Sequence, residues 1–159
     1  MHYLVRLVVN AENAEEAKHE AEYILDNLVQ WGEFDYYRLE GDESAWEDCW
    51  VPTPLTSEKG KAWAQDALDD HIAEFKDAMA TIREMVANYT DEEILEEKFN
   101  YNASKRNLSR YQFSKISGYH GKSCLLFDEC GDTISSQRIL DRYIAKPNNL
   151  WVIQVDCHN

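Results

Sequence analysis

The stretch of residues 100–122 combines basic and aromatic side chains that could bind an anionic ligand. It contains no acidic residue and carries these candidates: Lys105, Arg106, Arg110, Lys115, His120 and Lys122. Lysine and arginine pair with phosphates while aromatic rings stack on bases, as in many sites for single-stranded nucleic acid. The alternative, which we favour, is that these cations pack against the chain's own acidic helices, particularly residues 91–97, because the overall charge repels polyanions.

The two ends of the chain carry a second group of candidate side chains: His2, Asp156, Cys157 and His158. They come close together if the last strand pairs antiparallel with the first. Imidazole, carboxylate and thiolate are ligands that zinc uses, at distances of about 2.0 to 2.3 Å. Spacing alone supports a metal site only weakly, so we expect solvent-exposed polar ends, no metal and no cofactor.

The turn around Gly131 gathers four more side chains that could do chemistry: Asp128, Glu129, Cys130 and Asp132. Carboxylates at a strand end could bind a hard cation or transfer protons, and a thiol becomes a nucleophile when a neighbouring base lowers its pKa. No histidine lies nearby in sequence. A structural role, with Asp132 or Thr133 capping the next helix, is therefore the simpler interpretation.

The acidic loop of residues 41–56 is the best candidate for contact with another protein. Its candidate residues are Asp42, Glu43, Trp46, Glu47, Asp48 and Trp50. Tryptophan in a polar loop often anchors an interface, with its ring buried in the partner. The rings could instead fold back on the chain's own sheet, which we expect because a loop of this length usually needs something to hold it.

The net charge of -14 is concentrated in the first part of the 159-residue chain. Residues 1–100 hold 25 acidic and 8 basic side chains, whereas residues 101–159 hold 5 and 8. This charge disfavours nucleic acid and favours a basic protein surface. We therefore predict a protein-interaction module that engages a basic partner surface and could act as an inhibitor or as a nucleic-acid mimic.

The alternative function is a small ligand-binding domain or enzyme that acts on an anionic substrate at a basic and aromatic cleft. Asp128, Asp132 or His120 would act there together with the basic stretch. The sequence shows no nucleophile, base and orienting group together, so catalysis has no positive support.

The remaining composition predicts a cytoplasmic protein without a membrane span. No apolar run approaches the roughly 20 residues needed to cross a bilayer, and the first residues do not resemble a secretory signal. Four scattered cysteines form no close pair, which indicates free thiols.

Hydrophobic periodicity predicts the elements that position these side chains. Residues 3–9 carry mostly apolar side chains on both faces and read as a central strand, and Asn13 caps a helix whose apolar stripe ends at Gly32. Residues 34–39 read as a second strand. A long amphipathic helix follows from Ser57 to about Val86, and its length also predicts a homodimer.

The rest of the chain begins with a short helix and ends as strand, helix, strand. Thr90 starts a capping box, with the helix running to about Phe99. A strand at 124–128, a helix at 134–145 and a strand at 150–155 follow.

The two ends thus read β-α-β twice, within a single domain of residues 1–159 that contains a helical insertion at 41–122. The simplest merger is an α+β, ferredoxin-like split β-α-β antiparallel sheet, with the strands in spatial order four, one, three, two. The alternative is a three-layer α/β sandwich in which the long helix covers the second face of the sheet.

Overall fold

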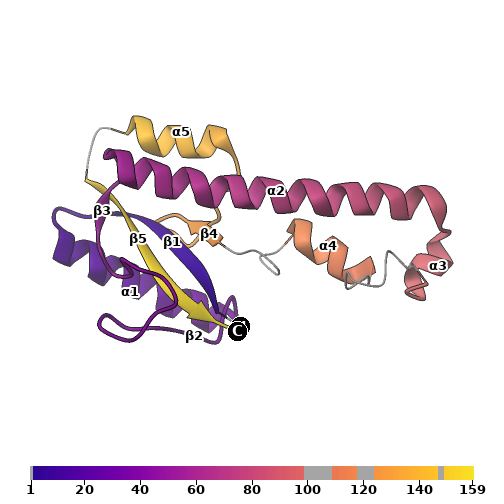
Figure 1. Ribbon diagram of the computed structural model, residues 1–159, viewed down its shortest axis with the longest axis horizontal. Coiled ribbons are helices and arrows are strands. Elements are labelled where there is room, and N and C mark those ends of the chain that lie inside the picture. The colour runs from indigo at the N-terminus through magenta and orange to yellow at the C-terminus, as the bar shows by residue number, and fades with distance from the viewer. Residues whose placement is uncertain (1, 99–108, 118–123, 147–148) are drawn as a thin grey trace. The chain divides into compact units, whose positions relative to one another are not determined.

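The computed structural model describes the whole chain except residues 1, 99–108, 118–123 and 147–148 and the side chains of Arg110 and Ser117. The described part is an α+β fold with five helices and one five-stranded mixed sheet (Figure 1). It forms two compact units. The sheet unit comprises residues 1–71 and 123–159, and the helical unit comprises residues 72–122. Within the described residues, no helix combines the length and the apolar character needed to cross a membrane.

The first strand and the first helix of the sheet unit lie where the hydrophobic periodicity predicts them. Strand β1 (His2–Asn10) is buried on both faces, and helix α1 (Ala14–Trp31) buries its predicted apolar stripe. The Asn13 side chain accepts a hydrogen bond from the Glu16 amide, which satisfies one free donor of the helix start. Gly32 ends the helix at a φ of 81°, a left-handed conformation that glycine adopts without strain.

Strand β5 (Leu150–His158) joins the end of the chain to its beginning. It pairs antiparallel with β1 along its whole length, from His2 opposite His158 to Asn10 opposite Leu150. The prediction that both ends share one sheet is therefore confirmed. The two short strands β2 (Tyr36–Tyr37) and β3 (Thr53–Pro54) pair with the other edge of β5.

The ferredoxin-like strand order is not confirmed. The observed order is β2-β5-β1-β4, and β4 (Cys124–Phe127) runs parallel to β1. A β-α-β crossover leaves room for one strand between its own two, and here β5 fills that gap between β1 and β2. After β4 the chain reverses at once, because the Ile134 amide bonds back to the Leu126 carbonyl before the next helix begins. Strand β5 consequently runs antiparallel to β1 and β4.

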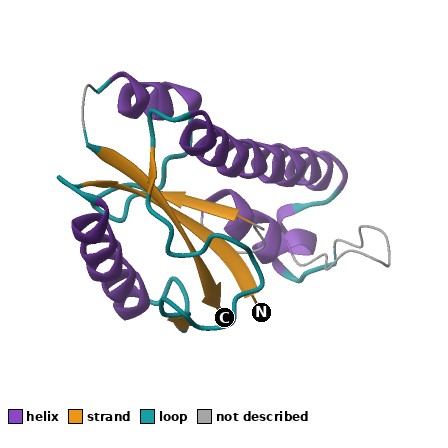
Figure 2. Ribbon diagram, turned by 60° about the vertical axis from the view of Figure 1, so that its left-hand side comes forward, coloured by secondary structure: helices purple, strands orange, loops and turns teal. Residues whose placement is uncertain are grey.

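Helices cover both faces of the sheet within the sheet unit (Figure 2). Helix α1 lies on one face, whereas α5 (Gln137–Ala145) and the first part of α2 (Glu58–Asn88) lie on the other. The three-layer alternative therefore describes this unit better. Arg6 of β1 points to the α2 face, where its guanidinium donates to the Trp63 carbonyl and lies 5.6 Å from the Trp63 ring centre.

The helical unit is built from the second part of α2 together with α3 (Asp91–Leu95) and α4 (Ser109–Ser117). Its core contains Ile82 and Met85. The predicted capping box at Thr90 is present, although α3 ends earlier than expected. The expected insertion at 41–122 thus divides between the units, because residues 41–71 belong to the sheet unit.

Candidate functional site

The acidic loop lies against strand β5 and forms what we call the strap, residues 41–52. The Trp50 amide donates to the Gln154 carbonyl at 3.0 Å, and the Gln154 side chain donates to the Glu47 carbonyl at 2.5 Å. Only 3% of Trp50 is exposed, and its indole donates to the Arg38 carbonyl at 2.7 Å. Trp50 therefore belongs to the core and is not available to a partner, whereas Trp46 is half-buried.

The strap adopts a backbone that needs support from packing. Asp48 and Trp50 have φ angles of 57° and 62°, in the left-handed region. This conformation costs roughly 1–2 kcal/mol for a residue with a Cβ atom. Burying a large aromatic side chain contributes about 1.5–3 kcal/mol, enough to hold Trp50 in this conformation.

The carboxylate of Asp156 fastens the start of the strap. It is 1% exposed and accepts hydrogen bonds from the Ala45 amide at 2.9 Å and the Ser44 hydroxyl at 3.2 Å. The other carboxylate oxygen lies 2.8 Å from Nδ1 of His2. Burial raises the pKa of Asp156, but the hydrogen bonds from Ala45, His2 and Ser44 outweigh it and leave the pKa below its ordinary value.

The end of the sheet places three of the four candidate metal ligands on one face. Asp156, His158 and His2 share this face, and the two imidazole centres are 5.0 Å apart. Cys157 lies on the opposite face and is buried, which raises its pKa well above the ordinary value. In the part of the chain that the structure describes, no group of three or more such side chains is arranged to hold a metal ion.

The expectation of exposed ends is wrong for Asp156 and Cys157, which are among the most buried residues of the chain. The physical reason is that β2 and the strap cover the outer edge of β5. In a nucleophile–base pair the Ser44 hydroxyl would donate to the His2 imidazole. Here the Ser44 hydroxyl donates to the Asp156 carboxylate. Its observed role is to join β1, β5 and the strap.

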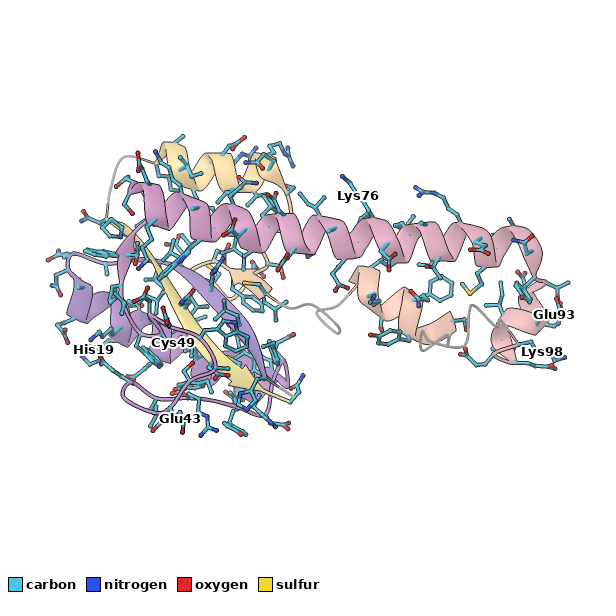
Figure 3. All side chains as sticks on the ribbon, viewed as in Figure 1. His19, Glu43, Cys49, Lys76, Glu93 and Lys98 are labelled. Atoms are coloured by element: carbon cyan, nitrogen blue, oxygen red, sulfur yellow. The ribbon has the colours of Figure 1, made fainter. Side chains whose placement is uncertain are left out.

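Exposed carboxylates dominate helix α1 and the segment that follows it. Residues 12–48 hold thirteen acidic side chains but only Lys18 and Arg38 as bases. We call the exposed carboxylates of this region the acidic surface: Glu12, Glu15, Glu20, Glu22, Asp26, Asp35, Glu40, Asp42, Glu43, Glu47 and Asp48. Figure 3 labels Glu43 in the strap and His19 on α1.

Two contacts join the carboxylates of helix α1 to those of the segment that follows it. Lys18 of α1 lies 2.6 Å from the Glu40 carboxylate, and the Tyr37 hydroxyl donates to Asp26 at 2.8 Å. Lys18 also reaches Glu15, and Lys59 pairs with Asp48. These two lysines contact three of the thirteen carboxylates but carry only two positive charges, so the surface stays strongly negative.

Two exposed aromatic rings on α1 were missed by the sequence interpretation. Tyr23 is 68% exposed and Trp31 is 61% exposed. Both lie off the apolar stripe of the helix, so the helical periodicity that identified the stripe could also have identified them. They add apolar contact area beside the carboxylates.

The turn around Gly131 has a structural explanation. One oxygen of Asp128 accepts from the amides of Cys130 and Asp132 at 2.9 and 3.0 Å, and the other accepts from the Tyr143 hydroxyl at 2.8 Å. Glu129 lies 3.8 Å from Lys146. The predicted cap at Asp132 or Thr133 is wrong, because α5 begins after Ser136. The carboxylate of Asp128 therefore organises the turn.

Most of the basic stretch falls outside the described residues, namely Lys105, Arg106, His120, Lys122 and the side chain of Arg110. Lys115 of α4 lies 3.2 Å from Glu74 of α2, within the helical unit. In the same unit the Ser109 amide donates to the Glu97 carboxylate at 2.5 Å. Lys115 therefore pairs with one of the chain's own carboxylates, as expected. That carboxylate belongs to α2, whereas the expected partners were residues 91–97.

Comparison with known proteins identifies a family. No curated protein and no solved structure matches the chain. Residues 1–159 match the family described as Domain of unknown function (DUF7995), and the chain therefore belongs to that family.

Proposed function

We propose that the protein is an interaction module that binds a basic protein surface through its acidic surface. The observation that carries the proposal is the excess of exposed carboxylates on α1 and the strap, with few cations to neutralise them. Opposite charge speeds encounter with a basic partner and suppresses binding to acidic ones. Such a module could inhibit its partner or occupy a nucleic-acid site on it.

The exposed ring of Tyr23 supports a partner that presents arginine or lysine. On a helix, residues three apart are neighbours, so Glu20 and Asp26 flank this ring. A cation between them can pair with a carboxylate and lie over the ring face, which adds about 0.5–1 kcal/mol at an exposed site.

The attachment of the strap also supports binding. Its backbone is bonded to β5 and its Trp50 is buried, so Glu43 and Glu47 project from a segment that is ordered before a partner arrives. Pre-ordering lowers the entropy cost of association.

The alternative function, binding of an anionic substrate at the basic stretch, has less support. Lys115, the one candidate of that stretch whose side chain the structure describes, already faces the Glu74 carboxylate. A cation that is paired within its own unit contributes less to an external anion.

Calorimetric titration with an arginine-rich peptide tests the proposal. We expect binding that weakens as salt rises, because the attraction between exposed charges is screened. The double variant Glu43→Lys with Glu47→Lys should abolish binding. The double variant Glu92→Lys with Glu96→Lys in α3 changes the net charge equally and should retain most of it. Absence of binding by the natural protein, or an equal loss in both variants, would contradict the proposal.

A further inference from the structure

We infer that the exposed ring of Trp31, at the C-terminal end of α1, is a subsite that receives a cationic side chain of the basic partner. The inference rests on the proposed function and adds a named contact to it, on α1 instead of the strap. This surface lies wholly within the sheet unit, where the end of α1 meets the turn around Gly131.

The Trp31 ring is held in place although most of it is exposed. It lies so close to Gly131 that a Cβ atom on this glycine would be 3.1 Å from Cζ3 and 3.7 Å from Cη2 of the indole. Leu28 of α1 packs at the same point, with its Cδ2 atom at 3.5 Å. Yet 61% of Trp31 remains exposed. One side of the ring is therefore fixed by packing before a partner arrives, which lowers the entropy cost of binding to the rest.

The described cations of the chain leave the Trp31 ring unoccupied. Other aromatic rings are covered by the chain's own lysines: Lys59 lies 4.6 Å from the ring centre of Trp63, and Lys146 lies 4.4 Å from that of Tyr143. No lysine or arginine in the described ranges lies over Trp31 in this way. Tryptophan is the side chain whose ring face attracts cations most strongly. The ring is thus open to a lysine or arginine from another protein.

The electrostatic surroundings of Trp31 also favour a cation. The last turn of α1 contains no basic residue, so nothing in that turn offsets the partial negative charge at this end of the helix. Asp132 directly follows Gly131 and is exposed. A cation over the Trp31 ring would therefore meet an aromatic face beside a carboxylate and a helix C-terminus.

Trp31 and Tyr23 are too far apart for one cation to lie over both rings. They stand eight residues apart on α1, which is about 12 Å along the helix axis. A cation must lie within about 6 Å of a ring centre to be attracted by it. The partner that uses both rings must therefore present two cationic side chains, a condition that an arginine-rich segment meets.

An NMR titration of the natural protein with an arginine-rich peptide tests the subsite, and its readout is the indole N–H resonance of Trp31. We expect this resonance to shift as the peptide binds, whereas that of the buried Trp50 should move clearly less. If the peptide binds while the Trp31 indole does not respond, the subsite is wrong although the proposed function stands. If the peptide does not bind at all, the proposed function fails and the subsite fails with it.

The variant Trp31→Leu gives an independent test by calorimetry. Leucine keeps an apolar side chain but has no aromatic face, so the affinity for the peptide should fall roughly two- to five-fold. Leu95→Ala is the control, because Leu95 is 70% exposed on α3, a second acidic helix, and it should leave the affinity unchanged. Both positions are exposed, so both variants should fold, which circular dichroism checks. An unchanged affinity in Trp31→Leu, or an equal loss in Leu95→Ala, would overturn the inference.

Discussion

The amide of Ala45 donates a hydrogen bond of 2.9 Å to the buried carboxylate of Asp156, 111 residues away in sequence. This contact fixes an exposed acidic loop to the last strand of the sheet. Because the strap begins here, the position of Glu43 and Glu47 depends on a group buried beneath them.

Replacing Asp156 with asparagine should destabilise the sheet unit. The amide group cannot accept from His2, Ser44 and Ala45 as a carboxylate does, so hydrogen bonds to a charged group are lost at a cost of about 2 kcal/mol. Urea unfolding followed by circular dichroism measures the change. Asp132→Asn, at an exposed position, should stay within about 0.5 kcal/mol of the natural protein.

The Asp156 carboxylate should also account for part of the loss of folding stability in acid. Because the folded pKa of Asp156 lies below the roughly 3.9 of an unfolded chain, its contribution is complete above about pH 3.9 and is lost as the pH falls through the lowered pKa. The urea midpoint should therefore fall more steeply in acid for the natural protein than for Asp156→Asn. Parallel curves for the two proteins would argue against an ionised Asp156.

The two tryptophans of the strap should respond differently to truncation. Trp50→Ala removes a fully buried ring and should cost about 3–5 kcal/mol of unfolding free energy. Trp46 is half-buried, so Trp46→Ala should cost clearly less. If Trp50→Ala left the stability unchanged while weakening binding of the arginine-rich peptide, Trp50 would be a partner anchor after all.

Gly60→Ala should destabilise the junction between β3 and α2. A Cβ atom at this position would overlap the Pro54 carbonyl oxygen, which is backbone and cannot move aside cheaply. We expect a loss of about 1–3 kcal/mol, the usual range for overpacking. Lys61→Ala, at the next and exposed position, is the matched control for the unfolding measurement and should change little.

The regular elements of the fold could be predicted because long amphipathic segments repeat their hydrophobic pattern many times. The cap at Asn13, the stop at Gly32 and the capping box at Thr90 all appear as expected. The antiparallel pairing of β1 with β5 was predicted too, because merging the two β-α-β halves into one sheet places the last strand beside the first, and both segments are apolar enough to be central strands.

The strand order could not be predicted from such patterns. β2 spans only Tyr36–Tyr37 and β3 only Thr53–Pro54, too short to show a period. Whether β5 or β4 fills the gap in the first crossover depends on tertiary contacts such as the hydrogen bond from Asp35 to His158. Periodicity describes one element at a time and does not determine which strand lies between β1 and β2.

The candidate site was predictable in composition but not in geometry. The acidic residues of the strap were identified, whereas the burial of Asp156 was not, because residues near a chain end are usually exposed. The left-handed conformations at Asp48 and Trp50, which turn the indole inward, also have no signature in residues that are not glycine.

The most direct test of the proposed function is an NMR titration of the isotopically labelled protein with an arginine-rich peptide at low salt. We predict that the largest shift changes fall on α1 and the strap, including the amides of Tyr23 and Glu43, and that α3 stays unchanged although it is also acidic. Changes concentrated in α3 and α4, or spread evenly over all acidic segments, would contradict a defined partner-binding surface.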